Sequence, residues 1–333
     1  MIVRQRFLRA AEMYREVFEY VESVLGLGKR VSEPERIFGG FMHKMYRLAT
    51  VSGTYAVKML DPAVMTRPDA AENYARAERL EDDLADNGIP VARALRFSGR
   101  KMHEVGGQYF YVFDWVNGSA LGWSKITADH CAAAGALLGR IHVIEKVDRM
   151  PVTDEVNTDW DAYIERARRC SPRVAAALAK NRGILYSAAA EYNDAMRRLP
   201  HIVTICDGDM DNKNVLWIGD DPVIIDLEAL DYGSPYAEAW QLALSWAGGV
   251  LCDIDMAKLH AFLDAYSRNG GFDIDVASVY GMGFSWLWWL DYNVRRALGD
   301  EGGDDESIAL GESESIATVD RIAYYASLRD KLF

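Results

Sequence analysis

One segment near the middle of the chain constrains the fold more than any other. Residues 201–230 read HIVTICDGDMDNKNVLWIGDDPVIIDLEAL and contain many β-branched residues, whereas alanine-rich sequence with helical periodicity surrounds them. The apolar runs 215–218 and 223–225 flank Gly219-Asp220-Asp221-Pro222 and predict a hairpin with a four-residue turn. The segment therefore predicts extended structure inside a mainly helical domain.

Polar residues at the open end of this hairpin predict a metal site. Pairing centred on residue 220 sets Asn214 opposite Asp226, and directly opposed residues in antiparallel strands lie about 4.5–5.5 Å apart. An amide oxygen and a carboxylate suit Mg²⁺, which takes most of its other ligands from phosphate and water. Asp209 stands five residues before Asn214. This order matches the base and the two metal ligands of kinases, so Asp209 is predicted as the base and Asn214 and Asp226 as metal ligands.

The chain divides into a strand-rich part and a helical part. The first part predicts, in order, an amphipathic helix over 6–25, three antiparallel strands over 36–60 with turns at Gly39-Gly40 and Ser52-Gly53, a helix of about 18 residues from Pro68-Asp69 to Asn87-Gly88, and a strand over 108–115. Alanine-rich helical sequence follows Asn117-Gly118. We therefore expect an α+β protein with domains at 1–116 and 117–333.

Six motifs, in this order, carry a resemblance to a known family: FGGFMHKMY, YAVKML, YFYVFDWVNG, LLGRIH, GDMDNKN and VIIDLE. They resemble motifs of the aminoglycoside phosphotransferase and choline kinase superfamily, which are small-molecule kinases. The resemblance implies a bilobal protein-kinase-like fold, with a small antiparallel-sheet N-lobe and a larger helical C-lobe. It also implies transfer of the γ-phosphate of ATP, with Mg²⁺, to a hydroxyl group. GTP stays open as an alternative nucleotide.

The resemblance implies a set of nucleotide-binding residues. Lys58, at the end of the third predicted strand, would pair the α and β phosphates. Family spacing identifies Glu78 as the partner of this lysine, whereas the helical phase favours Glu81 as the alternative. The remaining implied residues are Gly39 and Gly40 in the nucleotide loop, and Phe113, Asp114 and Val116 in the linker that receives adenine.

The chain departs from the family at the catalytic loop. Family members usually have a histidine that braces this loop two residues before the catalytic aspartate, where this chain has Asp207. A pseudokinase that binds nucleotide without transferring phosphate is therefore the alternative to an enzyme. A protein kinase is disfavoured, because only eight residues separate Asp226 from Pro235 and leave no room for a long activation loop. His142, in LLGRIH, is predicted to pack inside its helix bundle, and Glu228 to be either a metal contact or a surface acid.

Composition restricts the partners and the location. The 37 basic and 50 acidic residues give a formal charge of −13, which disfavours nucleic acid and anionic membrane surfaces. Neither an uncharged stretch long enough to span a bilayer nor an apolar signal core is present, so a cytoplasmic protein is expected, as a monomer or homodimer. The four cysteines form no C-x-x-C pair, which disfavours a zinc cluster or a disulfide scaffold.

The acceptor is the least determined part of the prediction. Residues 300–314 contain seven acids and no base, with Gly302-Gly303 and Gly311. This run is read either as a solvated, mobile loop or as a feature that attracts a cationic acceptor, such as an aminoglycoside or another amino sugar. A neutral sugar or an amino alcohol is the alternative acceptor. Trp286, Trp288 and Trp289 cannot share one helix face, so at least one should be exposed or line a cavity.

Overall fold

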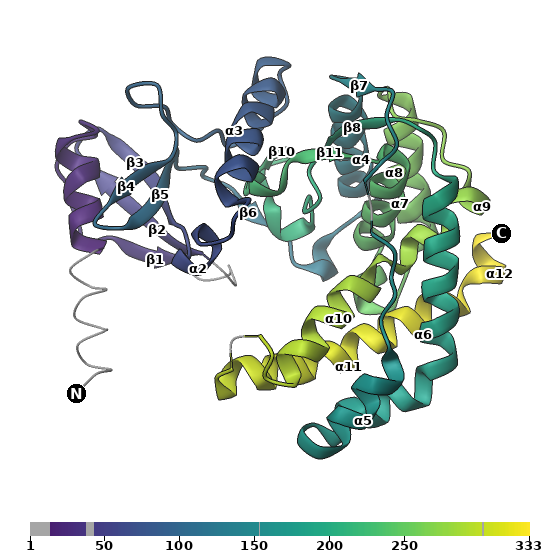
Figure 1. Ribbon diagram of the computed structural model, residues 1–333. Coiled ribbons are helices and arrows are strands. Elements are labelled where there is room, and N and C mark those ends of the chain that lie inside the picture. Colours follow the sequence, from purple (N-terminus) through teal and green to yellow (C-terminus); the bar gives the residue numbers. More distant parts are fainter. Residues whose placement is uncertain (1–13, 38–42, 153, 302) are drawn as a thin grey trace. The chain divides into compact units, whose positions relative to one another are not determined.

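The structure is a computed structural model that describes residues 14–37, 43–152, 154–301 and 303–333. The chain forms two compact units (Figure 1). The first contains residues 1–120 and 214–231, and the second contains residues 121–213 and 232–333. The central hairpin thus belongs to the first unit, whereas the sequence assigned it to the second. The hairpin joins the first unit because its strand β9 (Val215–Ile218) hydrogen-bonds to β6 (Ser119–Ala120), which ends the segment 1–120.

The first unit is built on a five-stranded antiparallel sheet in the order β1-β2-β3-β5-β4. Its strands are β1 (Glu35–Ile37), β2 (Lys44–Thr50), β3 (Gly53–Met59), β4 (His103–Val105) and β5 (Gln108–Asp114). Helical residues 14–23 cover one face, where Val17 and Phe18 pack with Leu48, Val57 and Val112 of the sheet. The predicted strands are confirmed. Gly39, Gly40 and the first half of the predicted N-terminal helix lie outside the described residues.

Two helices follow β3, namely α2 (Pro62–Met65) and α3 (Ala70–Asp86). Helix α3 buries an apolar stripe that includes Leu80 and Leu84. It ends at Asp86 with Asn87 as its C-cap, and Gly88 takes a left-handed φ of 72°, which confirms the predicted end. The fully buried Lys101 holds α3 in place, because its Nζ lies 2.8 Å from the carbonyl oxygen of Glu78 and 2.9 Å from Oδ1 of Asp82.

The hairpin of β9 and β10 (Asp221–Ile224) has a two-residue turn, Gly219-Asp220, in which Gly219 has a φ of 64°. The predicted four-residue turn is wrong, and so is the register. A tighter turn leaves Asp221 and Pro222 in the strand, which moves the pairing by one residue. Val215 lies opposite Ile224, and the Asn214 carbonyl accepts from the Ile225 N–H at 2.9 Å. Strand β10 is at the edge of its sheet, where Pro222 is tolerated.

The second unit is mainly helical. A three-stranded sheet in the order β11-β8-β7 lies beside its helices, and β11 crosses the boundary between the units. The elements are α4 (Ala128–His142), β7 (Lys146–Val147), α5 (Trp160–Cys170), α6 (Pro172–Arg198), β8 (Val203–Cys206), β11 (Asp231–Gly233), α7 (Pro235–Trp246), α8 (Met256–Arg268), α9 (Val276–Val279), α10 (Trp286–Ala297), α11 (Asp305–Ser327) and α12 (Arg329–Leu332). None of the helices within the described ranges is long and apolar enough to cross a membrane.

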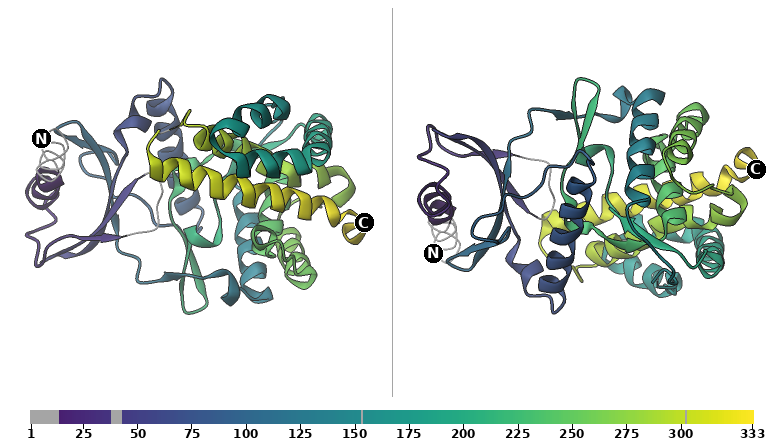
Figure 2. Two further views of the ribbon diagram at one scale, coloured as in Figure 1. Left: turned by 90° about the horizontal axis from the view of Figure 1, so that it is seen from below. Right: turned by 90° about the horizontal axis from the view of Figure 1, so that it is seen from above.

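From Asp305 onward, the acidic run forms a helix where the sequence suggested a loop. Helix α11 begins at Asp305, after Asp304 caps it by accepting from the Ser307 N–H at 2.7 Å. Acids in a first helical turn complement the helix dipole, so they favour helix formation. Gly311 serves close packing instead of flexibility, because a Cβ there would lie 2.5 Å from the Ala297 nitrogen. Figure 2 shows α10 and α11 side by side.

Candidate active site

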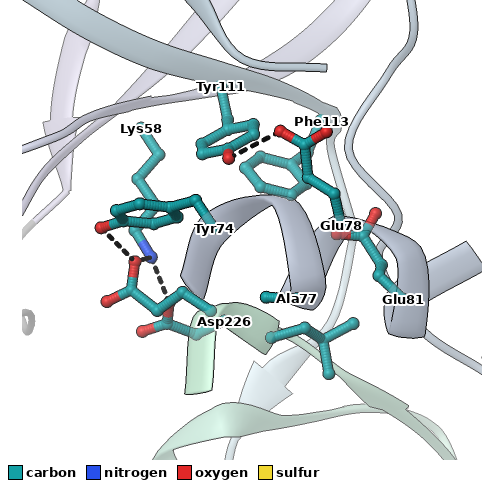
Figure 3. Close-up of a pocket in the computed structure, with 10 residues that line it drawn as sticks. Lys58, Tyr74, Ala77, Glu78, Glu81, Tyr111, Phe113 and Asp226 are labelled. Carbon is teal, nitrogen blue, oxygen red and sulfur yellow. Dashed lines mark hydrogen bonds and ion pairs between the residues drawn. The ribbon is translucent and has the colours of Figure 1, made fainter. Parts of the chain in front are cut away.

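A pocket in the first unit brings together residues from four elements (Figure 3). Its lining comes from β3, α3, β5 and the residues that follow β10, and consists of Lys58, Tyr74, Ala77, Glu78, Glu81, Tyr111, Phe113, Asp226, Leu227 and Glu228. Segments more than 150 residues apart in the sequence therefore supply one group of charged side chains.

Lys58 is buried in this pocket, with 4% of its surface exposed. Its Nζ binds the carboxylate of Asp226, and lies 2.7 Å from Oε2 of Glu228. Burial alone would lower the pKa of Lys58, but the two carboxylates outweigh burial and raise it. The lysine stays charged, as pairing with phosphate requires. It is not a solvated edge residue.

Glu228 is held by three donors. His43 lies 3.0 Å away through Nε2 and Tyr74 lies 3.4 Å away through its hydroxyl, in addition to Lys58. The Asp61 N–H donates to His43 Nδ1 at 3.0 Å, so Nε2 carries the proton of this ring and donates it to Glu228. Burial would raise the pKa of Glu228, but the hydrogen bond from His43 and the charge of Lys58 bring it to about 2.

Helix α3 supplies neither carboxylate that binds Lys58. The Glu78 carboxylate accepts from the Tyr111 hydroxyl at 2.9 Å, as Figure 3 shows. Glu81 accepts from the Ala94 N–H and from Lys101 at 3.1 Å. Within the described residues, neither glutamate is paired with Lys58, so the pairing implied by the family resemblance is not present in this structure. His43 was missed in the sequence because it lies 185 residues from Glu228.

Asp226 has a backbone conformation that is rare outside glycine, with a φ of 64° and a ψ of 51°. This left-handed conformation costs about 1 kcal/mol or more, and such strain is often found at functional sites. Asp226 follows β10 and Asn214 precedes β9, so the two lie near the same end of the hairpin, although they are not opposite each other. The carboxylates of Asp226 and Glu228 converge on one ammonium group, so their charge and oxygen chemistry also fit a divalent cation.

The predicted adenine-binding residues lie at the end of β5. Phe113 lies opposite Ala56 of β3 and lines the pocket, and Asp114 lies opposite Tyr55. Val116 follows the strand and is half-buried. The structure thus brings Phe113 together with Lys58 and Asp226, whereas Asp114 and Val116 line a second pocket.

Asp209 lies in the second unit, on the loop after β8. Its side chain is 40% exposed and lies 3.2 Å from Lys213 Nζ. The surrounding loop is fixed, because Trp246 donates to the Met210 carbonyl at 3.0 Å and Ser245 donates to Asp211 at 2.7 Å. A carboxylate that is exposed on a fixed loop can accept a proton from a bound hydroxyl group.

Comparisons with known proteins agree with this chemistry. The model of the phosphotransferase enzyme family matches residues 34–277. A homoserine kinase from Methylobacillus flagellatus is 25% identical over 237 residues, which are 69% of this chain and 68% of that protein.

Solved structures confirm the α+β, protein-kinase-like fold. A spectinomycin phosphotransferase in complex with ADP and spectinomycin aligns with a TM-score of 0.68 at 12% identity, covering 94% of this chain and 98% of that one. An ethanolamine kinase from Plasmodium vivax aligns with a TM-score of 0.56 at 15% identity, covering 86% and 81%. The chain belongs to the phosphotransferase enzyme family, and is an ATP-dependent enzyme that transfers a phosphoryl group to a hydroxyl acceptor.

Proposed function

We propose that this enzyme phosphorylates a hydroxyl group of a small cationic acceptor, such as an aminoglycoside or another amino sugar, with Mg²⁺ and ATP. The observation that carries the nucleotide part is the buried Lys58, whose ammonium group binds both Asp226 and Glu228. A charged lysine beside convergent carboxylates is the combination that a metal-bound triphosphate requires.

Each residue of the nucleotide site has a proposed role. Lys58 pairs the α and β phosphates, and Asp226 and Asn214 hold Mg²⁺, which neutralises charge on the phosphates when it is bound. A cation at Asp226 competes with Lys58 for the same carboxylate. We propose that Glu78, which lines the same pocket, then becomes the partner of Lys58. Adenine would lie against the backbone at residues 113–116, and Gly39-Gly40 would cover the phosphates.

Asp209 is proposed to accept the proton of the acceptor hydroxyl group. Replacing Asp209 by Asn keeps the size and removes the base, so turnover should fall about 10²–10⁴-fold while nucleotide affinity stays unchanged. Asp211→Asn is the matched control, because an amide oxygen can still accept from Ser245. It should stay within about threefold of native turnover. Near-native turnover of Asp209→Asn with every acceptor tested would contradict the role of Asp209.

The cationic acceptor has two supports. Ethanolamine, which names one similar kinase, is a cationic amino alcohol, and homoserine, which names another, carries an ammonium group beside a carboxylate. In addition, Asp304, Asp305 and Glu306 are exposed at the start of α11. The homoserine kinase similarity also favours an amino alcohol as the second candidate acceptor.

One screen tests both acceptor classes. ADP release is measured with Mg²⁺, and with ATP or GTP, against aminoglycosides, amino sugars, amino alcohols and neutral sugars. Turnover with a cationic acceptor supports the proposal, and turnover with neutral sugars alone contradicts it. Nucleotide binding without metal-dependent turnover on any acceptor would support the pseudokinase alternative.

A further inference from the structure

A buried polar cluster in the second unit contacts the loop that carries Asp209. His142, at the end of α4, has no exposed surface, and Glu238 of α7 is 6% exposed. Tyr266 of α8 is also completely buried. Buried polar side chains in a helical core are costly unless every donor and acceptor is paired. The partners of these three residues therefore indicate what the cluster does.

The hydrogen bonds of the cluster form one continuous chain that ends on the catalytic loop. Glu238 Oε2 lies 2.7 Å from His142 Nε2, and Glu238 Oε1 accepts from the Gly208 N–H at 2.7 Å. At the other end, His142 Nδ1 lies 2.8 Å from the Tyr266 hydroxyl, which lies 3.5 Å from the Pro235 carbonyl oxygen. Every donor in this chain has an acceptor within hydrogen-bond distance.

A metal centre is the competing explanation, because the ligand atoms of His142, Cys206 and Glu238 all lie within 4.8 Å of one another. Two nitrogen or oxygen ligands on a tetrahedral zinc lie about 3.3 Å apart, given bonds of about 2.0–2.1 Å. The 2.7 Å between His142 and Glu238 is instead a hydrogen-bond length. Burial also raises the pKa of the Cys206 thiol, which opposes the thiolate that a metal needs. The geometry favours hydrogen bonding.

We propose that Glu238, held by His142 and Tyr266, is a positioning residue for the catalytic loop. Its carboxylate fixes the Gly208 N–H, and Gly208 directly precedes Asp209. Family members usually have a bracing histidine where this chain has Asp207. Glu238 thereby holds the loop in place of that histidine. The proposal rests on the proposed function only in that Asp209 is the base.

Kinetics of three variants test the proposal. Glu238→Ala removes the acceptor of the Gly208 N–H, so kcat should fall about 10²-fold, as expected when a catalytic group is misplaced by about 1 Å. The KM for ATP should change less than threefold. Tyr266→Phe removes only the far end of the chain and should lower kcat by about three- to tenfold. Tyr325→Phe is the matched control, because its buried hydroxyl binds Trp240 and the Tyr280 carbonyl and does not contact the loop. It should keep native kcat despite a lower melting temperature.

Equal kcat for Tyr266→Phe and Tyr325→Phe, or a folded Glu238→Ala with native kcat, would overturn the proposal. If Glu238→Ala does not fold, the kcat values of Tyr266→Phe and Tyr325→Phe test the proposal by themselves. Zinc bound stoichiometrically to the purified native protein, and lost in Glu238→Ala, would also overturn it.

A second measurement is independent of the acceptor and of turnover. Hydrogen exchange of the Gly208 amide, followed by NMR without substrate, should be at least tenfold faster in Tyr266→Phe than in native protein and unchanged in Tyr325→Phe. Unchanged Gly208 exchange in Tyr266→Phe would overturn the proposed bracing even if no acceptor had been found. Faster exchange together with absent turnover would leave the bracing supported and contradict the proposed function alone.

Discussion

Lys58 shows how the partner of one side chain depends on distant parts of the chain. The sequence places it on a strand and leaves two acids of one nearby helix as possible partners. In the structure, Lys58 binds Asp226 and Glu228, which are 168 and 170 residues away. Buried charges need counter-charges, and the hairpin end supplies two of them, so Glu78 is left to bind Tyr111.

Two isosteric substitutions separate the candidate partners of Lys58. Glu228→Gln removes a charge that holds the lysine, and Glu78→Gln removes its proposed partner in the metal-bound state. Each should raise the KM for MgATP about tenfold, since a hydrogen bond to a charged group contributes about 1.5–3 kcal/mol. Steady-state kinetics with varied ATP measures both. A raised KM for Glu228→Gln alone would show that Glu78 never pairs with Lys58.

The buried Glu238 should make stability depend on acid pH. Burial would raise its pKa, but the hydrogen bond and charge of His142 outweigh burial and lower it below the ordinary value of 4.5. The other titratable groups that face the Glu238 carboxylate are Cys206 and Tyr266. A carboxylate whose pKa is lower in the folded state stabilises the protein above pH 4.5, and this contribution is lost as the pH falls further.

Melting temperatures from pH 7 to pH 3 check this expectation. At pH 7 the melting temperature of native protein should be higher than that of Glu238→Gln. This difference in melting temperature should become smaller as the pH falls below about 4.5. A gap that stays constant down to pH 3 would mean that the charge of Glu238 does not contribute to folding.

At the scale of elements, helix packing depends on where glycine allows close approach. A Cβ on Gly135 of α4 would lie 2.2 Å from the carbonyl oxygen of Phe262, and one on Gly139 would lie 2.5 Å from that of Tyr266. Both contacts are with the backbone of α8, which cannot move like a side chain. The alanine-rich composition predicted the helix, but the position of its neighbour came only from packing.

Two Gly→Ala substitutions test this packing. Gly135→Ala should destabilise the protein by about 2 kcal/mol, because the new methyl group overlaps the α8 backbone. Gly183→Ala, inside α6, is the matched control, since a Cβ there meets nothing within 4 Å. It should stabilise the protein by about 0.5–1 kcal/mol through helix propensity. Chemical denaturation measures both, and equal effects of the two substitutions would refute close packing at Gly135.

At the scale of the whole molecule, the acidic surface bears on the acceptor. Several acids of the run already have partners, since Asp300 pairs with Arg166, Glu301 with Arg295, and Glu314 with Arg321. Asp305 and Glu306 remain exposed in the first turn of α11. The charge available to attract a cation is therefore concentrated at this helix start.

Salt dependence tests whether that charge attracts the acceptor. With a cationic acceptor, kcat/KM should fall as ionic strength rises above about 0.1 M, where the Debye length is about 10 Å. The double variant Asp305→Asn and Glu306→Gln should flatten this dependence while leaving the Asp304 cap of α11 intact. The control is Glu165→Gln with Asp264→Asn, an equal charge change on other helices. Equal flattening by both pairs would assign the effect to net charge alone.

The sequence by itself determined much of the secondary structure and the family. Alternation, helical periodicity and turn residues are local properties, so the strands β1, β2, β3 and β5 and the end of α3 formed as predicted. His142 is packed as predicted, and the exposure of Trp288 and Trp289 agrees with the prediction that at least one of the three tryptophans would be exposed or line a cavity. The order of six motifs was enough to indicate the phosphotransferase family.

Only the tertiary structure decided which charges meet. The hairpin register depended on whether the turn had two residues or four, and a change of one residue removed the predicted pairing of Asn214 with Asp226. The partners of Lys58, the hydrogen bond from His43 to Glu228 and the contact of Glu238 with Gly208 all join distant segments. Such contacts are selected by the burial cost of each charge and by close backbone packing, and neither can be read from local sequence periodicity.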